Sequence, residues 1–282
     1  MRLPLPKQYY QINDIHYKGK RIRTYSFGVG EKKVLSLPAF PHSGIIYLYF
    51  LLKYDLNKVQ FITFDLPGWI GRSENIFKNG VYDEKEMLEL LDHIINHFSL
   101  KSFSVIGYSF GTSLACALVG ENKYNIEKLA LISPVIYGKA IKEKAKRFLL
   151  NFIQFTDTFI FARLYVLSRF KVYKPTLIHT GMDVRILQEY KEMIYSADPK
   201  VIFTSLKHLF SSDYCEIIRN FPHNHLLVAN SKDESKFLRD QAAHIRRIVD
   251  GVKTLFLHGA HEDFILKPSS DVVKAVIRFL TS

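Results

Sequence analysis

Two hydrophobic patterns alternate along most of this 282-residue chain. Short runs that are apolar at nearly every position predict strands buried on both faces of a sheet. They lie at 34–37, 59–64, 103–106, 129–132, 226–229 and 254–257. Segments with apolar residues at helical spacing lie between most of them, including 87–98, and another follows the last run, at 272–280. Because strands and helices alternate, the sequence predicts an α/β fold in which helices flank a mainly parallel central sheet.

The N-terminal part of the chain has a different pattern. Strand-like segments at 12–17 and 21–27 flank Lys18-Gly19-Lys20, which predicts a β-hairpin ahead of the parallel strands. Further along, Asp83-Glu84-Lys85-Glu86 resembles a capping box, so the sequence predicts that the helix covering 87–98 begins there.

One interval breaks the alternation. From 135 to 222 the sequence contains no convincing strand, only helical segments rich in aromatic residues. Its most apolar part, 147–170, is interrupted by polar residues, which indicates an amphipathic helix and not a membrane span. We therefore expect an all-helical lid at 135–222, inserted into a core formed by 1–134 and 223–282.

Composition restricts the class of protein. Apolar residues make up 48% and aromatic residues 14% of the chain, which is typical of a globular protein with a large core. No window holds about 18 uninterrupted apolar residues, so no membrane span is expected. Residues 1–19 lack the apolar segment of a secretory signal, and Cys116 and Cys215 match no disulfide or metal pattern. These features predict a cytoplasmic protein with free, mostly buried thiols.

The chain is basic, with 39 Lys and Arg against 27 Asp and Glu and a formal net charge of +12. The basic residues are spread along the sequence without a nucleic-acid-binding motif, so a nucleic-acid partner is not expected. The densest cluster, 138–148, adjoins the apolar segment 148–170, and together they would suit an interfacial helix or equally a buried lid helix. We expect no stable membrane insertion, and the sequence leaves the oligomeric state undetermined.

A serine between two glycines follows the apolar run 103–106, in the pentapeptide Gly107-Tyr108-Ser109-Phe110-Gly111. A serine hydroxyl is a weak nucleophile near neutral pH and needs a base within hydrogen-bond reach. A sharp strand-to-helix turn would expose that hydroxyl above the sheet, and the glycines would let strand and helix approach closely. The helix that follows would direct its free N–H groups at developing negative charge. Ser109 is therefore the candidate nucleophile.

Five segments, in this order, resemble the α/β-hydrolase family. They are LPAFPHSG at 37–44, FDLPGWIGRS at 64–73, GYSFG at 107–111, ANSKDES at 229–235 and HGAHEDFILKP at 258–268. The first three resemble the family's His-Gly-x-Pro turn, its Asp-x-Pro-Gly-x-Gly-x-Ser segment and its nucleophile elbow. The last two resemble the loops of the catalytic acid and histidine. The resemblance runs from about residue 10 to the C-terminus and implies the α/β-hydrolase fold with a Ser–acid–His triad.

The chain holds eleven histidines. His261 is the candidate base because it lies just past the last apolar strand, at the edge where a parallel sheet carries its site. Asp233 is the candidate acid because it follows the preceding strand, and the order Ser109, Asp233, His261 matches that of the family. The neighbouring Glu234 is one alternative acid. Asp65 is another, but it belongs to a Pro-Gly turn, where an acidic side chain usually accepts hydrogen bonds from local N–H groups.

The resemblance also implies an oxyanion hole. Its two donors would be the N–H groups of Phe110, after the nucleophile, and Phe40, in the turn after the third strand. In that turn Ala39 stands where the family more often has glycine. The candidates for contact with substrate are His42, Trp69 and Tyr108.

The sequence thus predicts a serine hydrolase that cleaves esters of small to medium apolar acids through an acyl-enzyme intermediate. A lactonase or a carbon–carbon bond hydrolase would use the same triad and differ in pocket shape. An alternative from another class is a binding module on the same fold that holds a ligand under the lid without turnover. No metal cluster, phosphate-binding loop or dinucleotide fingerprint accompanies the triad, so we expect no cofactor or metal ion and a small-molecule ester as partner.

Overall fold

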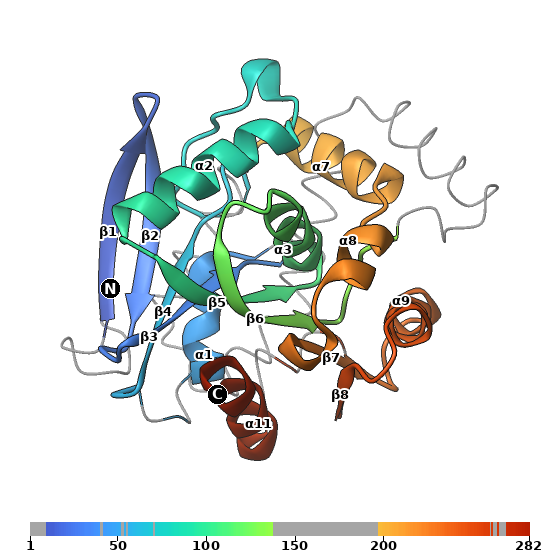
Figure 1. The fold of residues 1–282 in the computed structure, drawn as a ribbon. Helices are drawn as coiled ribbons and strands as arrows, with labels where there is room; N and C mark the ends of the chain where they lie inside the picture. Colours follow the sequence, from blue (N-terminus) through green and yellow to red (C-terminus); the bar gives the residue numbers. More distant parts are fainter. Residues whose placement is uncertain are drawn as a thin grey trace.

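The structure is a computed structural model that describes residues 10–39, 42–51, 54, 56–69, 71–137, 197–259, 261, 264 and 269–282. The described residues form one eight-stranded sheet with the strand order β1-β2-β4-β3-β5-β6-β7-β8 (Figure 1). The strands are β1 (Tyr10–Tyr17), β2 (Lys20–Phe27), β3 (Lys32–Leu37), β4 (Val59–Phe64), β5 (Ser102–Tyr108), β6 (Asn125–Ile132), β7 (Leu226–Ser231) and β8 (Lys253–Leu257). All eight strands that the sequence predicts are present, so the α/β prediction is confirmed.

The sheet is parallel except at one side. β1 pairs antiparallel with β2 as the predicted hairpin, and β2 pairs antiparallel with β4. From β4 onward every neighbouring pair is parallel. β3, β5 and β6 lie in the interior of the sheet with apolar residues on both faces, which is why they appear in the sequence as nearly continuous hydrophobic runs.

The parallel strands end at a common edge. Gly107 of β5 lies beside Leu37 of β3, and Tyr108 of β5 lies beside Ile132 of β6. Ile132 in turn lies beside Ala229 of β7, and β8 continues the ladder beyond β7. The residues that follow these strands are therefore brought together at one edge of the sheet, where α/β proteins bind their ligands.

Seven helices are described besides short 3₁₀ turns. They are α1 (Tyr47–Leu51), α2 (Glu84–His97), α3 (Phe110–Gly120), α7 (Pro199–Ser211), α8 (Cys215–Asn220), α9 (Lys236–Ile248) and α11 (Ser270–Thr281). α2 begins at Asp83, whose carboxylate accepts hydrogen bonds from the N–H groups of Lys85 and Glu86. The helix start predicted from the capping-box pattern is therefore present, with Asp83 as the capping residue. α11 covers the predicted C-terminal helix and begins at Ser269.

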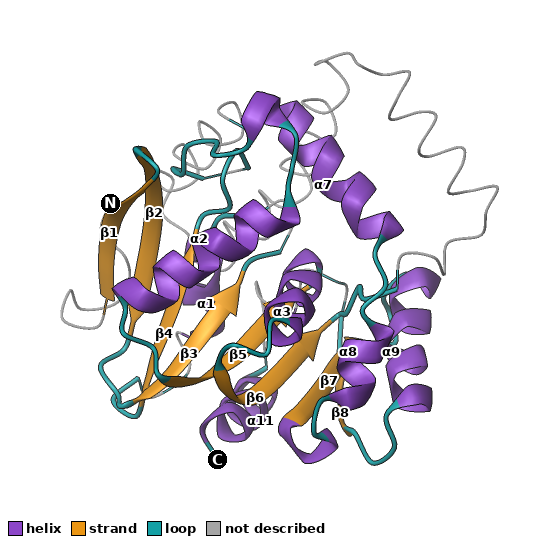
Figure 2. Ribbon diagram, turned by 45° about the horizontal axis from the view of Figure 1, so that its top comes forward, coloured by secondary structure: helices purple, strands orange, loops and turns teal. Residues whose placement is uncertain are grey.

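The sheet separates two hydrophobic cores. On one face Leu90 of α2, Leu114 of α3 and Ile245 of α9 belong to a single buried cluster. On the other face Phe50 of α1 and Val276 of α11 belong to the second. Figure 2 shows the sheet between these two layers of helices. α3 is buried along almost its whole length, because the sheet and the helices beside it cover it together.

The expected lid at 135–222 is described only in part, since 138–196 lie outside the described residues. Its described C-terminal part carries α7 and α8, and no strand occurs there beyond a single bridge between Tyr137 and Asp213. This part contacts the core directly: Trp69 Nε1 donates to Ser205 Oγ over 3.2 Å. The lid and its boundaries stay a prediction.

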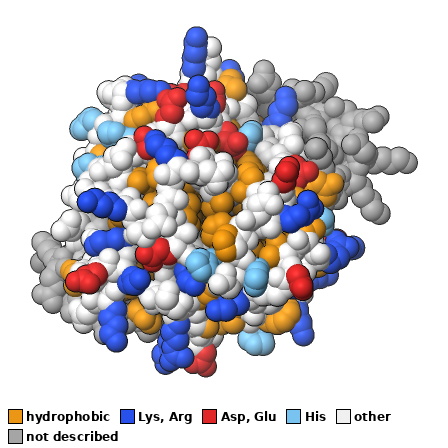
Figure 3. All heavy atoms as spheres, in the orientation of Figure 1, with side chains coloured by type: hydrophobic (Ala, Val, Ile, Leu, Met, Phe, Trp, Pro, Cys, Tyr) orange, Lys and Arg blue, Asp and Glu red, His pale blue; other side chains and the backbone are white. Residues whose placement is uncertain are grey.

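The surface charge is dispersed. In Figure 3 the Lys and Arg side chains are scattered over the visible face and interleaved with acidic side chains. Exposed ion pairs such as Lys123 Nζ–Asp92 Oδ1 at 2.6 Å and Lys18 Nζ–Glu89 Oε2 at 2.9 Å contribute to this mixture. The basic segment 138–148 lies outside the described residues. Among the helices that the structure describes, none combines the length and apolarity needed to cross a bilayer.

Candidate active site

Ser109 forms the sharp turn between β5 and α3. Its backbone torsion angles are φ 53° and ψ −116°, a left-handed conformation that residues other than glycine rarely adopt. Its N–H donates to the carbonyl oxygen of Ile132 over 2.9 Å, and its carbonyl accepts from the N–H of Thr112 at 2.9 Å. The side chain is half-buried and makes no capping hydrogen bond to α3. The backbone therefore holds this hydroxyl in a strained turn at the N-terminus of a buried helix.

The two glycines around Ser109 allow β3, β5 and α3 to approach one another. A Cβ atom on Gly111 would lie 2.1 Å from the carbonyl oxygen of Leu37, and one on Gly107 would lie 2.5 Å from the carbonyl oxygen of Gly111. Both neighbours are backbone atoms, which cannot move aside by rotating a side chain. The close packing of this turn thus requires glycine at both positions.

His261 lies against the residue that precedes Ser109. Its imidazole is stacked on the ring of Tyr108, with the ring centroids 5.0 Å apart and the planes at 29°. The Tyr108 hydroxyl also donates a hydrogen bond to the main-chain carbonyl of His261. The His261 side chain is 22% exposed. Ser109 and His261 are therefore both fixed to Tyr108, one through the chain and the other through ring and hydrogen-bond contacts.

Glu234, and not Asp233, is the acid that contacts His261. Glu234 Oε1 lies 3.0 Å from His261 Nδ1, and the Glu234 side chain is only 1% exposed. This corrects the sequence-based prediction that Asp233 contacts the imidazole. The two residues are adjacent in the turn after β7 and differ in burial: Glu234 is buried and Asp233 is exposed.

Asp233 instead joins the turn after β7 to the end of β8. Its Oδ2 accepts a hydrogen bond from the N–H of Gly259 at 3.1 Å, and its own N–H donates to Ser231 Oγ at 3.0 Å. Ser231 Oγ in turn donates to the carbonyl of Gly259 at 2.6 Å. These contacts fix the chain shortly before His261, so Asp233 supports the site without touching the imidazole.

Two further donors surround the Glu234 carboxylate. The hydroxyl of Ser133, which follows β6, donates to Oε1, the same oxygen that faces His261. The main-chain N–H of Ser231 donates to Oε2 over 3.2 Å. A buried carboxylate needs such partners, because burying an unpaired charge is costly. Neither serine was identified as a site residue from the sequence, and the only signal is that each lies at the C-terminal end of a parallel strand or directly after it.

The structure describes only one of the two donors that are predicted for the oxyanion hole. Phe110 is the first residue of α3, where the peptide N–H has no acceptor within the helix. Phe40 lies outside the described residues. The preceding Ala39 is buried, and its carbonyl accepts the N–H of His42 at 2.8 Å.

The predicted substrate-contact residues are all buried. His42 is 3%, Trp69 2% and Tyr108 1% exposed. The Trp69 ring packs on Phe110 with a centroid distance of 4.6 Å, which places it beside the residue after the candidate nucleophile. Tyr108 directs its hydroxyl and one ring face to His261, so in this structure it supports the histidine. A role for any of the three in substrate contact stays a prediction.

Asp65 has the local role expected of it. Its carboxylate accepts the N–H groups of Gly44 at 2.9 Å and Arg72 at 2.7 Å. The Tyr25 hydroxyl donates over 2.8 Å, and the Ser43 hydroxyl donates to the other oxygen. Burial raises the pKa of Asp65 above its ordinary value, and these hydrogen bonds oppose that rise. Asp65 therefore fastens the turns after β3 and β4 together.

The two cysteines lie on α3 and α8. Burial raises the pKa of Cys116 well above its ordinary value and that of Cys215 to about 12, and both cysteines are free thiols. Among the described residues, no three His, Cys, Asp or Glu side chains are grouped closely enough to hold a metal ion.

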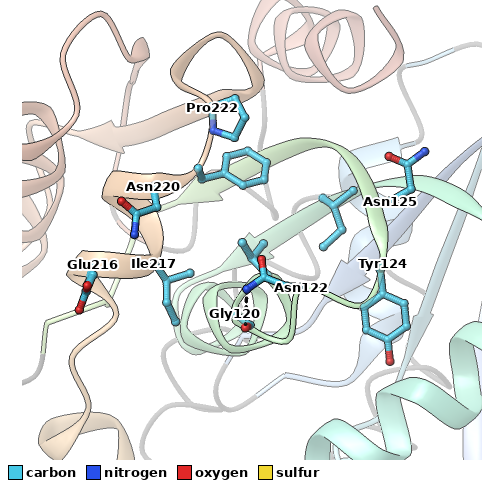
Figure 4. Close-up of a pocket in the computed structure, with 11 residues that line it drawn as sticks. Gly120, Asn122, Tyr124, Asn125, Glu216, Ile217, Asn220 and Pro222 are labelled. Carbon is cyan, nitrogen blue, oxygen red and sulfur yellow. Dashed lines mark hydrogen bonds between the residues drawn. The ribbon is translucent and has the colours of Figure 1, made fainter.

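A hollow of about 460 Å³ lies at the far end of α3 from Ser109 (Figure 4). Its lining includes Gly120, Asn122, Tyr124, Ile217, Asn220 and Phe221. α3 spans 11 residues, or about 16 Å at 1.5 Å per residue, and Ser109 stands at its opposite end. This hollow is therefore not the pocket of the Ser109–His261–Glu234 group.

Comparison with known proteins agrees with this architecture. A family model described as "alpha/beta hydrolase fold" matches residues 33–181, more than half of the chain. A segment of 82 residues, 29% of this chain, is 35% identical to "Probable lysophospholipase BODYGUARD 2" of Arabidopsis thaliana. That segment spans only 17% of the length of the Arabidopsis protein.

Solved structures resemble the chain over nearly its whole length. An esterase from Exiguobacterium antarcticum has a TM-score of 0.73 at 15% identity and covers 94% of this chain and 97% of its own. A bromoperoxidase from Bacillus anthracis has a TM-score of 0.72 at 14% identity and covers 96% of this chain and 100% of its own. The names of these two proteins indicate different activities, so the likeness concerns the fold alone. From the family match and the architecture together, the chain belongs to the α/β-hydrolase fold family.

Proposed function

We propose that this protein is a serine hydrolase that cleaves carboxylic esters of small to medium apolar acyl groups through an acyl-enzyme intermediate. Ser109 is the nucleophile, His261 the general base and Glu234 the acid. Glu234 replaces Asp233 in this role because it is the carboxylate within hydrogen-bond distance of the imidazole.

The proposed reaction has two halves. Nε2 of His261 takes the proton of Ser109 Oγ as this oxygen attacks the ester carbonyl carbon, and the resulting oxyanion accepts hydrogen bonds from the N–H groups of Phe110 and Phe40. The ester C–O bond then breaks, and the imidazolium gives its proton to the departing alcohol. Water, deprotonated by the same nitrogen, attacks the acyl-serine and releases the carboxylic acid with Ser109 restored.

The hydrogen bond between Glu234 and His261 Nδ1 is the observation that carries this proposal. It fixes the tautomer in which Nδ1 is the donor, so the lone pair of Nε2 is free to act as a base. The Glu234 carboxylate also stabilises the imidazolium that forms during the attack. The strained backbone of Ser109 is a second, independent support, since such strain recurs at the nucleophile of this kind of turn.

Ester hydrolysis is favoured over the other reactions of this fold by the residues of the site and by one relative. A serine at the elbow suits acyl transfer, and the buried rings of Trp69 and Phe110 pack together next to it, which gives the site the apolar surroundings expected around an apolar acyl group. Over a short segment the chain also resembles a protein named as a probable lysophospholipase, which is a name for an ester-cleaving enzyme.

The test is labelling with a fluorophosphonate probe, read by intact-protein mass spectrometry. The wild-type protein should gain one adduct, and Ser109→Ala should gain none. Ser113→Ala, which removes a neighbouring buried hydroxyl from α3, serves as the matched control and should still be labelled. Turnover is then measured on p-nitrophenyl esters of two to eight carbons, a lactone and a lysophospholipid.

The outcomes separate the alternatives. Labelling with ester turnover supports the proposal, and labelling with preference for the lactone moves the assignment to a lactonase. A folded wild-type protein that gains no adduct and hydrolyses none of the substrates would refute the catalytic proposal and favour the binding module.

A further inference from the structure

Ser133 occupies an unusual position next to the proposed triad. It follows β6 directly, is fully buried, and has φ 48°, a conformation that a serine seldom adopts. Its N–H donates to the carbonyl oxygen of Ala229 in β7 at 2.7 Å, which fixes this conformation. Its hydroxyl points at the Glu234 oxygen that also faces His261.

We propose that Ser133 is a positioning residue of the catalytic machinery, whose hydroxyl holds the Glu234 carboxylate against His261 and keeps it charged. This inference rests on the proposed function, because it assigns how the acid of that triad is tuned. Ser133 touches neither the substrate nor the reacting atoms, so it acts only through Glu234.

The two oxygens of the Glu234 carboxylate have different hydrogen-bond partners. Oε1 accepts from two side chains, Ser133 and His261, whereas Oε2 accepts from the Ser231 N–H at 3.2 Å. A hydrogen bond to the ionised form of a carboxyl group favours that form. The Ser133 hydroxyl does not titrate in the working range of the enzyme, so it supplies a constant donor while His261 gains and loses its proton.

The same hydroxyl also sets how strongly the carboxylate attracts the imidazolium. By donating to Oε1 it favours the ionised carboxylate beside Nδ1, where the negative charge stabilises the protonated ring. Without the hydroxyl, the carboxylate would be held at this oxygen by His261 alone, and its ionised form would be less favoured. Loss of the Ser133 hydroxyl should therefore disfavour the imidazolium and move the titration of His261 to lower pH.

Other charged groups near the hydrogen bonds of Ser133, Glu234 and His261 have partners of their own. Asp233 binds the N–H of Gly259, and the Arg239 guanidinium of α9 binds the main-chain carbonyls of Glu234 and Lys232. From β5, the Tyr108 hydroxyl binds the carbonyl of His261. Lys232 and His258 are further titratable groups on the two loops, and Glu262, Asp263 and Lys267 follow His261 in the sequence, outside the described residues. All of them are retained when Ser133 alone is changed, so a shift of the titration reports on its hydroxyl.

The experiment compares Ser133→Ala with Ser133→Gly. Both remove the hydroxyl, but glycine adopts a positive φ without strain whereas alanine does not. The histidine ring protons are followed by NMR between pH 4.5 and 9, and the His261 signal is assigned by its absence from His261→Gln. Ser104→Ala is the matched control: it removes a buried hydroxyl whose bond to the Leu280 carbonyl, 2.6 Å long, lies away from the site.

We expect the midpoint of the His261 titration to fall by about half a pH unit or more in both Ser133 variants and to stay unchanged in Ser104→Ala. With an ester substrate, the acid limb of kcat/KM should move the same way, and kcat should fall about tenfold with KM little changed. Ser133→Gly should show the same changes, even though glycine fits the positive φ of this turn better than alanine does.

An unchanged or raised midpoint in folded Ser133→Gly would overturn the inference, because a role in packing or backbone strain alone predicts no fall. The titration is independent of turnover. If no protein in the series hydrolyses esters, the proposed function fails, and the NMR midpoints still decide whether Ser133 acts on the Glu234–His261 pair.

Discussion

Tyr108 binds His261 in two ways at once, since its ring lies 5.0 Å from the imidazole and its hydroxyl donates to the histidine's main-chain carbonyl. Tyr108 is also the residue before Ser109, so the same side chain ties the loop of the proposed base to the strand of the proposed nucleophile. The relative position of the two groups thus depends on this tyrosine.

Tyr108→Phe keeps the ring and removes only the hydrogen bond to the His261 loop. We expect kcat to fall about threefold to tenfold, because small displacements of a base from its nucleophile are costly, and stability to fall by about 1 kcal/mol. The measurements are steady-state ester hydrolysis and urea unfolding. Tyr124→Phe, which removes a hydroxyl bound to Asp92 at 2.9 Å, is the control and should lose stability without losing kcat. Equal kcat in both variants would contradict this role of Tyr108.

The assignment of the acid is tested by a pair of neighbouring substitutions. Glu234→Gln should lower kcat by about 10³- to 10⁴-fold, since it removes the charge that stabilises the imidazolium and disturbs the tautomer. Asp233→Asn should lower it by less than about tenfold, because Asp233 accepts only a main-chain N–H. Both are measured by ester hydrolysis on folded protein. A larger loss in Asp233→Asn would restore the original prediction.

Asp233 and Glu234 also show which part of the site could not be predicted from the sequence. The interior strands β3, β5 and β6 could be predicted because burial on both faces leaves a continuous apolar run, and Gly111 because a turn this tight excludes a side chain. The acid could not be chosen in the same way. Asp233 and Glu234 are adjacent and both carboxylic, and which of them turns inward depends on donors from distant segments, such as Ser133.

Partners far apart in the sequence were beyond prediction for the same reason. Trp69 is recognisable as an aromatic residue near the site, but its hydrogen bond to Ser205 joins positions separated by 136 residues. No local pattern encodes such a contact, since it exists only after α7 has packed on the core. The sequence therefore identifies reactive residues at strand ends more reliably than the residues that orient them.

Gly111→Ala should destabilise the fold. The added Cβ would lie 2.1 Å from the Leu37 carbonyl and 3.0 Å from that of Pro38, so β3 and α3 would have to separate. We expect a loss of about 3 kcal/mol in the free energy of unfolding, measured by urea denaturation. Gly19→Ala is the control: its Cβ would meet nothing within 4 Å, and its positive φ of 74° should cost only about 1 kcal/mol. A tolerated Gly111→Ala would show that the turn is less tightly packed than described.

Acid should destabilise the contact between α2 and the described C-terminal part of the expected lid. Burial alone would raise the pKa of Glu84, but hydrogen bonds from His208, at 2.8 Å, and from Tyr214 outweigh it and leave that pKa below its ordinary value of 4.5. The unfolded chain therefore takes up this proton at higher pH than the folded protein does. The stabilisation is complete above the ordinary value and is lost as the pH falls below it.

The measurement is Tm between pH 7 and pH 3. The wild-type protein should lose Tm more steeply below about pH 4.5 than Glu84→Gln, which has no carboxyl group to titrate at this place. Glu216→Gln, which changes an exposed glutamate on α8, should follow the wild-type curve. Parallel curves for wild type and Glu84→Gln would show that this contact carries no pH-dependent stability.

β8 has a strand neighbour on only one side among the described strands, yet it leads directly to His261. A strand at the border of a sheet exchanges its amide protons through local openings that cost less free energy than unfolding the whole domain. The proposed nucleophile, by contrast, follows β5 in the interior of the sheet. Warming or mild denaturant should therefore release the base while the nucleophile is still in place. The protein would then populate a folded but inactive state, which differs from the active one by the detachment of one short strand.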